Sequence, residues 1–294
     1  MVRTGFAIWR RGRDGGKPHT QIGMILPNLG RRVQNVLMRS TGRTGTSVLE
    51  RAFSLLDVLS SSGSSVGLAE LARRAGLPKA TAYRLASQLV DLRVLERDGQ
   101  DYQVGVRLFE LGNSVARQRQ LREASLPFME DLYEATHETI HLGVLDNGEV
   151  LYVEKIAGRR TCSVSTTLGA RKPLYCTGLG KAILAYSSSE LLQAVIKNGL
   201  IRRTRYTITD PHRLQWELAR ATDTGIIYDR EEYELGITCV SSPVLNRAGR
   251  AWAAISVTGP TTRFRPENTA AAVRTAALGL TRVLSNHVGW GAAE

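Results

Sequence analysis

The most constraining feature of the sequence is a pair of short amphipathic segments that meet at Gly76. Residues 67–75 place apolar side chains at helical spacing, and a glycine just past such a segment is a common helix end. Pro78 then stands in the first turn of a second helical segment, where proline is tolerated. Two short helices joined by so tight a turn predict a helix-turn-helix, with its second helix over residues 78–89.

The flanking segments extend this motif into a domain. Residues 47–60 carry apolar side chains at helical spacing, and residues 61–65 are expected to form a loop. Beyond the motif, the pair Asp98 and Gly99 stands between two short alternating segments and predicts a β-hairpin turn. A helix, a helix-turn-helix and a hairpin, in that order, predict a winged helix-turn-helix domain over residues 46–105.

The outward face of the helix that starts at Pro78 is rich in hydrogen-bond donors. The major groove of duplex DNA admits a helix, and such donors suit base edges and phosphates. Arginines at the end of the preceding helix and on the hairpin can reach the sugar-phosphate backbone or a flanking groove. The predicted DNA-binding residues are Arg73, Arg74, Lys79, Thr81, Tyr83, Arg84, Ser87, Gln88 and Arg97.

The distribution of charge leaves an alternative open. Residues 46–113 hold eight basic and eight acidic side chains, so this helix face could instead be a solvated surface that meets a protein partner. Most of the net charge of +12 lies in residues 1–45, which hold nine basic residues and one acidic residue. This Gly- and Arg-rich stretch predicts a disordered basic tail. It either touches phosphates or reflects an upstream start codon, with Met24 and Met38 as alternative starts.

The length and composition favour an intracellular protein of two domains. A chain of 294 residues suits two domains, and 43% hydrophobic with 22% charged residues is an ordinary globular balance. No apolar run is long enough to cross a membrane, and the N-terminus lacks a secretory pattern, so we expect a cytoplasmic protein without membrane contact. Three widely spaced cysteines predict neither a disulfide framework nor a zinc site.

The remainder of the chain predicts a second domain. Residues 106–120 continue as one helix within a linker over residues 106–124, and a further helix covers residues 126–136. Residues 125–290 then mix hairpins, the clearest at Asn147 and Gly148, with helices that include residues 210–224, capped by Thr209. Hairpins and helices joined by long connections predict an antiparallel sheet covered by helices, and hence an α+β fold.

The order of several motifs resembles the IclR family of bacterial regulators across residues 46–285. The matching stretches include residues 46–52, residues 68–72, the run from Gly76 to Lys79, residues 173–182, and a signature from Gly225 to Asn246. Leu245 departs from the aromatic or His that is usual there, and Arg93 stands where a glycine is common. The resemblance implies a GAF-like effector domain and no enzymatic activity. It also implies a homodimer or homotetramer on operator DNA, with a small organic, sugar or aromatic acid as effector.

Positions that match the family's pocket also have a physical rationale. The glycine-rich start of the helix at residue 178 presents backbone N–H groups that favour a carboxylate. The hydroxyls of Ser256 and Thr258 are two residues apart and therefore share one face of a strand, and Cys239 provides a small, polarizable side chain for the pocket wall. The predicted effector-binding residues are Gly178, Leu179, Asp229, Cys239, Ser256 and Thr258.

Each pocket residue also has a structural alternative. The glycines could serve close packing, the two hydroxyl residues could be ordinary strand positions, and Asp229 could pair with Arg230 or a nearby arginine. Arg171 and Lys172 lie just before the pocket segment. They could attract an anionic ligand, but a solvated loop is the favoured expectation.

Enzymatic functions find little support in the residues. The chain lacks a GxSxG nucleophile elbow, and His137 and His141 do not form an HExxH zinc motif. We predict no catalytic residue, no metal and no cofactor. The alternative to a DNA-binding regulator is a small-molecule sensor that acts through protein contacts.

Overall fold

The computed structural model describes residues 47–158 and 166–286. They fall into two compact units that divide between Val104 and Gly105, and each unit is described by itself. The tail predicted over residues 1–45 lies outside the described residues. No helix in the described ranges is both long and apolar enough to cross a membrane.

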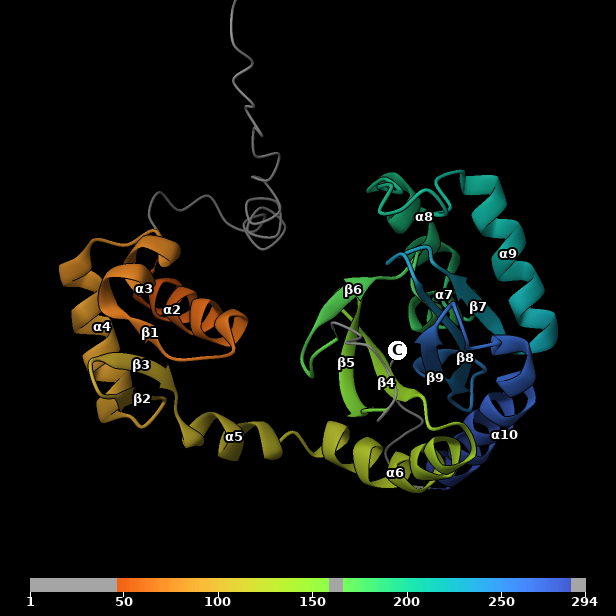
Figure 1. Cartoon of the computed structure of the whole chain (residues 1–294), viewed down its shortest axis with the longest axis horizontal. Coiled ribbons are helices and arrows are strands. Elements are labelled where there is room, and N and C mark those ends of the chain that lie inside the picture. The colour runs from red at the N-terminus through yellow and green to blue at the C-terminus, as the bar shows by residue number, and fades with distance from the viewer. Residues whose placement is uncertain (1–46, 159–165, 287–294) are drawn as a thin grey trace, which may run out of the picture. The chain divides into compact units, whose positions relative to one another are not determined.

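The first unit is the predicted winged helix-turn-helix. Its three helices pack on a small antiparallel sheet of order β1-β3-β2 (Figure 1). Leu55, Leu71, Leu85, Leu95 and Tyr102 lie in its core and are almost fully buried. The elements are α2 (Val48–Ser62), β1 (Val66–Gly67), α3 (Leu68–Ala75), α4 (Lys79–Asp91), β2 (Leu95–Asp98) and β3 (Asp101–Val104).

Local signals explain most of these boundaries. Ser47 and Glu50 form a reciprocal capping box at the start of α2, and Gly76 ends α3 in the left-handed region with φ of 67°. The hairpin turn differs from the expected one by a residue. Asp98 pairs with Asp101, so the two-residue turn is Gly99 and Gln100. Gly99 still supplies the positive φ that the turn requires.

The connection between the units differs from the expected single helix. It contains α5 (Val106–Asn113), which buries no side chain, and then α6 (Ala116–Thr136), which runs without interruption through Pro127. The sequence predicted a helix to residue 120 and another from residue 126, whereas the break lies at residues 114–115. The reason is tertiary, because Leu121 and Met129 both pack into the core of the second unit and hold one continuous helix there.

The second unit is built on a six-stranded antiparallel sheet of order β6-β5-β4-β9-β8-β7. Asn147 and Gly148 form the turn between β4 and β5, both with positive φ, as predicted. The strands are β4 (Thr139–Asp146), β5 (Glu149–Ile156), β6 (Arg171–Pro173), β7 (Ile227–Arg230), β8 (Ile237–Leu245) and β9 (Ala251–Pro260). The helices beyond α6 are α7 (Gly178–Ala185), α8 (Ser189–Lys197), α9 (Pro211–Thr224) and α10 (Pro266–Ser285).

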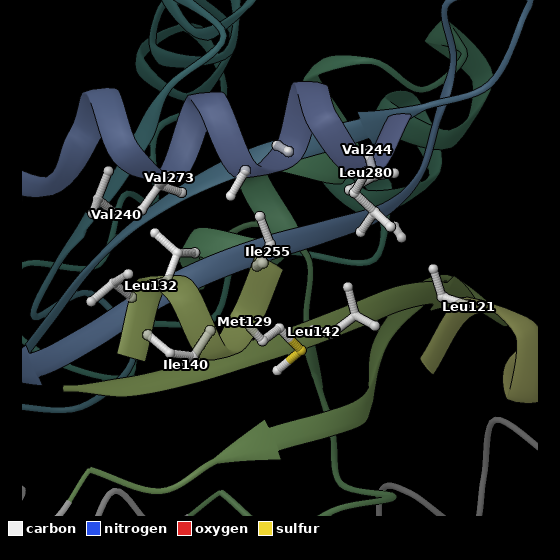
Figure 2. Packing of buried hydrophobic residues seen from close by; sticks show 14 of the residues in the cluster. Leu121, Met129, Leu132, Ile140, Leu142, Val240, Val244, Ile255, Val273 and Leu280 are labelled. Carbon is white, nitrogen blue, oxygen red and sulfur yellow. The ribbon is translucent and has the colours of Figure 1, made fainter. Parts of the chain in front are cut away.

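Helices cover both faces of this sheet. On one face α6 and α10 pack over Ile140, Leu142 and Ile255, as Figure 2 shows. On the other face α7 and α9 enclose a second core. Alternation along β4 therefore sends Ile140 and Leu142 to the first face and His141 to the second, which is the face that carries the cavity described below.

Two local expectations in this unit were wrong. Asp210, rather than Thr209, caps α9, because its Oδ1 accepts a hydrogen bond from the Arg213 N–H at 2.7 Å. Arg171 and Lys172 do not lie in a solvated loop. They belong to the edge strand β6, which pairs with β5 and buries Lys172.

Candidate DNA-reading helix and effector cavity

The outer face of α4 presents most of its predicted contact residues to solvent. Lys79, Arg84 and Gln88 are exposed, and Tyr83 keeps 52% of its surface accessible. The opposite face, with Ala82 and Leu85, is buried in the core of the first unit. The remaining two predicted residues of this helix, Thr81 and Ser87, are half-buried at its edges.

The arginines outside α4 make contacts within the protein. Arg73 binds both carboxylate oxygens of Glu70, and this hydrogen bonding lowers the pKa of Glu70. Arg74 donates to the hydroxyls of Ser61 and Ser62 at 3.0 and 2.6 Å. Both arginines are exposed. Exposed contacts of this kind contribute little free energy, so each arginine could give up its contact within the protein and bind a phosphate instead.

Arg97 lies on the hairpin and packs against Tyr102. Its guanidinium carbon is 4.9 Å from the centre of the ring, and Nη2 donates to the Tyr102 hydroxyl at 3.0 Å. This contact fixes the direction of an exposed arginine on the wing.

All six predicted effector residues line one cavity in the second unit, of about 30 Å³. The start of α7 contributes Gly178 and Leu179, and strand β7 contributes Asp229. Ser256 and Thr258 lie on the same face of β9, as their spacing requires. Cys239 on β8 completes the predicted set.

The predicted set did not include seven further polar residues that line this cavity. One of them, Lys172, is only 8% exposed, and its Nζ lies 3.1 Å from Thr166 Oγ1 and 4.4 Å from the centre of the Tyr233 ring. Burial lowers the pKa of Lys172. The negative charges of neighbouring carboxylates, of which Glu234 has the largest effect, raise the pKa of Lys172. The additional residues are His141, Tyr152, Thr166, Lys172, Thr177, Tyr233 and Glu234.

His141 is a neutral imidazole, and one of its two ring nitrogens has no hydrogen-bond partner. Its Nδ1 lies 3.3 Å from Thr258 Oγ1, while Nε2 is buried without a hydrogen-bond partner. Burial, with the nearby charges of Lys155 and Lys172, lowers the pKa of His141 to about 3. The strict alternation along β4 is the signal that could have placed His141 on the cavity face.

Asp229 is a buried carboxyl that does not pair with Arg230, so that alternative is wrong. Arg230 pairs with Glu267, and Asp229 Oδ1 accepts the Glu232 N–H at 2.8 Å. Burial, followed by the charge of Glu232, raises the pKa of Asp229 to about 7. Asp229 can therefore exist in either protonation state near neutral pH.

The glycines of α7 are required for close packing as well as for the cavity wall. A Cβ at Gly178 would overlap Cys239 Sγ, and one at Gly180 would lie 2.5 Å from the Leu174 carbonyl oxygen. The Gly180 N–H donates to Thr177 Oγ1, so this amide is already satisfied within the protein.

The cavity offers binding groups rather than a nucleophile. Burial raises the pKa of the Cys239 thiol to about 12, so this cysteine is neutral. Within residues 47–158 and 166–286, no group of three His, Cys, Asp or Glu side chains could hold a metal ion.

Comparison with known proteins matches both units. The C-terminal domain of bacterial IclR transcriptional regulators matches residues 113–282, and the IclR helix-turn-helix domain matches residues 48–99. The chain is 35% identical to the uncharacterized HTH-type transcriptional regulator RhmR of Escherichia coli, over 74% of this chain and 85% of the relative. It is 31% identical to the acetate operon repressor of Salmonella typhimurium, over 74% and 81%.

Solved structures give the same result. An IclR homolog from Microbacterium hydrocarbonoxydans, complexed with 4-hydroxybenzoate, superposes with a TM-score of 0.75 at 29% identity. The alignment covers 81% of this chain and all of that chain. The IclR protein of Thermotoga maritima superposes with a TM-score of 0.70 at 29% identity, over 81% of this chain and 98% of that chain.

Proposed function

The chain belongs to the IclR family of transcriptional regulators, and we propose that its effector is a compact carboxylic acid bound in the cavity beside Lys172. It combines a helix-turn-helix DNA-binding domain with a C-terminal effector domain, and its relatives are regulators and repressors rather than enzymes. The observation that carries the proposal is a buried lysine in a small cavity that all six predicted effector residues also line.

The cavity's chemistry supports an acid. Burial disfavours the Lys172 ammonium, and the nearby carboxyl groups of Glu234 and Asp229 offset only part of that effect, so the Lys172 Nζ favours a further anionic group beside it. The free Nε2 of His141 and the hydroxyls of Ser256 and Thr258 can hydrogen-bond the rest of the ligand. Protonated Asp229 can donate to a ligand oxygen without repelling the acid.

The cavity's size supports a compact ligand. An engineered cavity of about 150 Å³ holds benzene, whereas this cavity has about 30 Å³. An aromatic acid such as the 4-hydroxybenzoate in the Microbacterium homolog would require it to widen. We therefore favour an acid of a few heavy atoms over an aromatic or sugar acid.

For DNA recognition, α4 enters the major groove of an operator, with Lys79 and Arg84 as its central contacts. Arg73, Arg74 and Arg97 bind the phosphate backbone on either side. Support comes from the solvent exposure of these side chains.

We propose that the protein acts as a homodimer, or as a pair of dimers, on a roughly palindromic operator. Both units expose large apolar side chains that a second copy can cover. Leu49 and Phe53 on α2 are 71% and 63% exposed, and Phe109 on α5 is 68% exposed. Effector binding would shift the relative placement of the two copies of α4, through a coupling of about 1–3 kcal/mol or roughly 5- to 150-fold in operator affinity.

Three substitutions test whether DNA binding and acid binding use separate sites. Arg84→Ala removes a DNA contact and should weaken operator binding by about tenfold or more, leaving acid binding unchanged. Ser256→Ala and Lys172→Met should weaken acid binding and leave the affinity for operator DNA without acid unchanged. Operator affinity is measured by fluorescence anisotropy, and acid binding by thermal shift with two- to four-carbon and aromatic carboxylates.

The matched control is Arg250→Ala, which removes an exposed arginine from the β8–β9 turn. It should change neither property. If Arg84→Ala and Ser256→Ala each impair both properties equally, the assignment of separate sites is wrong. If aromatic acids stabilise the protein more than compact ones, the size argument fails.

A further inference from the structure

A second and much larger cavity lies in the same unit. It is a cleft of about 660 Å³ bounded by residues 202–210, α9 and β7, and it shares no lining residue with the effector cavity. Neither the family resemblance nor the proposed effector accounts for it. We refer to it as the arginine cleft, after its lining residues Arg202, Arg205, Arg213, Arg220 and Arg230.

The positive charge of the arginine cleft is largely uncompensated. Arg230 pairs with Glu267, but within the described residues no carboxylate lies within ion-pairing distance of the other four arginines. Asp210, Glu217 and Glu232 also line the cleft, and the latter two are paired with Lys181, which is fully buried.

Several of these arginines are held in place. Arg205 stacks over Tyr206 at 4.9 Å, and Arg220 stacks over Trp216 at 4.8 Å. Arg202 donates to Thr209 Oγ1 at 3.3 Å. A guanidinium oriented in this way loses less freedom when it binds an oxyanion through its paired N–H groups.

The cleft also contains an unsatisfied acceptor. Glu232 is only 5% exposed, and while its Oε1 binds Lys181, its Oε2 is buried without any hydrogen-bond partner. A bare anion placed next to this carboxylate would be repelled. A hydroxyl group that donates to Oε2 would satisfy it.

We propose that the arginine cleft is a second ligand site, for a small oxyanion that also carries hydroxyl groups. The arginines bind its phosphate or carboxylate, and Glu232 accepts a hydrogen bond from one of its hydroxyls. The shared chemistry is a hydroxylated anion, whether a phosphate ester or a hydroxy acid. This site is separate from the effector cavity and does not depend on what binds there.

Calorimetric titration of the full chain tests the proposal, at an ionic strength of about 0.15 M. The probes are glycerol 3-phosphate, gluconate and inorganic phosphate. The first two are a hydroxylated phosphate ester and a hydroxylated carboxylate, and inorganic phosphate is an anion that carries no carbon-bound hydroxyl group. At least one of the two hydroxylated probes should bind, and inorganic phosphate should bind about tenfold more weakly or not at all.

Variants locate the binding. Arg205→Ala combined with Arg213→Ala should weaken the binding of the hydroxylated probe by about tenfold or more, whereas the matched control Arg250→Ala should not. Glu232→Gln should reduce the preference for the hydroxylated probe over phosphate. Because that change also breaks the pair with Lys181, the double arginine variant decides the location if Glu232→Gln does not fold.

Three results would overturn the proposal. The first is that neither hydroxylated probe binds. The second is that inorganic phosphate binds as tightly as both. The third is that Ser256→Ala or Lys172→Met abolishes binding while the double arginine variant retains it, because the probes would then occupy the effector cavity. Failure of the effector assignment leaves these measurements unaffected.

Discussion

At the scale of single residues, the buried ionisable groups of the effector cavity determine how ligand binding and stability depend on charge. Lys172, His141 and Asp229 face the same small space, and burial shifts the pKa of each toward its neutral form. A protein tolerates such groups where a ligand can use them. Asp229, with its pKa of about 7, is the one whose charge changes near neutral pH.

This shift predicts a pH-dependent stability. The pKa of Asp229 rises from 3.8 to about 7 on folding, so between these values the folded state holds a proton that the unfolded state has released. The resulting stability is present at low pH and is lost as pH rises through about 7. Asp229→Asn, which cannot ionise, should therefore gain stability relative to the parent protein as pH rises from about 4 to 8, by a few kcal/mol at ~1.4 kcal/mol per pKa unit.

Urea unfolding of both proteins across this pH range measures the difference. Thr222→Ala, at an exposed position in the same unit, is the control; it removes no titratable group and should show a difference that does not vary with pH. A constant difference for Asp229→Asn as well would mean that Asp229 is ionised in the folded protein throughout.

At the scale of elements, helix ends are set by a few side chains close in sequence. Ser47 Oγ accepts the Glu50 N–H at 3.1 Å, and the Glu50 carboxylate accepts the Ser47 N–H in return. These bonds satisfy two amides that no helical partner can reach. The start of α2 is therefore determined locally, and it holds the helix whose Leu55 and Leu59 enter the core of the first unit.

Ser47→Ala should destabilise the first unit by about 1 kcal/mol, because it removes the cap. The matched control is Ser54→Ala in the middle of the same helix. The Ser54 hydroxyl only donates to the Arg51 carbonyl, so alanine there should be neutral or slightly stabilising. Thermal unfolding followed by circular dichroism measures both, and equal effects of the two substitutions would argue against the capping box.

At the scale of the whole molecule, the chain consists of two units with separate cores. Leu71 is fully buried in the first core and Leu142 in the second. Between them, α5 buries no side chain. Nothing in the described cores requires the two units to unfold together.

Calorimetry should therefore show two unfolding transitions that can be moved separately. Leu71→Ala and Leu142→Ala each leave a cavity that costs about 2–5 kcal/mol. The first should lower the melting temperature of one transition, and the second that of the other. A single transition that either substitution lowers would show that the units unfold as one.

Local patterns in the sequence determined most elements and part of the effector cavity. The turn at Asn147 and Gly148 and the glycine after α3 depend on neighbouring residues alone, and strand alternation placed Ser256 and Thr258 on one face. Such features have a fixed period or a fixed backbone requirement, so they can be predicted without knowing what packs against them.

Only the tertiary structure decided which distant residues complete these sites. Lys172 enters the effector cavity because β6 pairs with the edge of β5, and α6 continues through Pro127 because Leu121 and Met129 pack into the second core. The arginine cleft likewise joins a loop, a helix and a strand that are separated in sequence. Burial and charge at such places depend on long-range packing, for which a local pattern contains no signal.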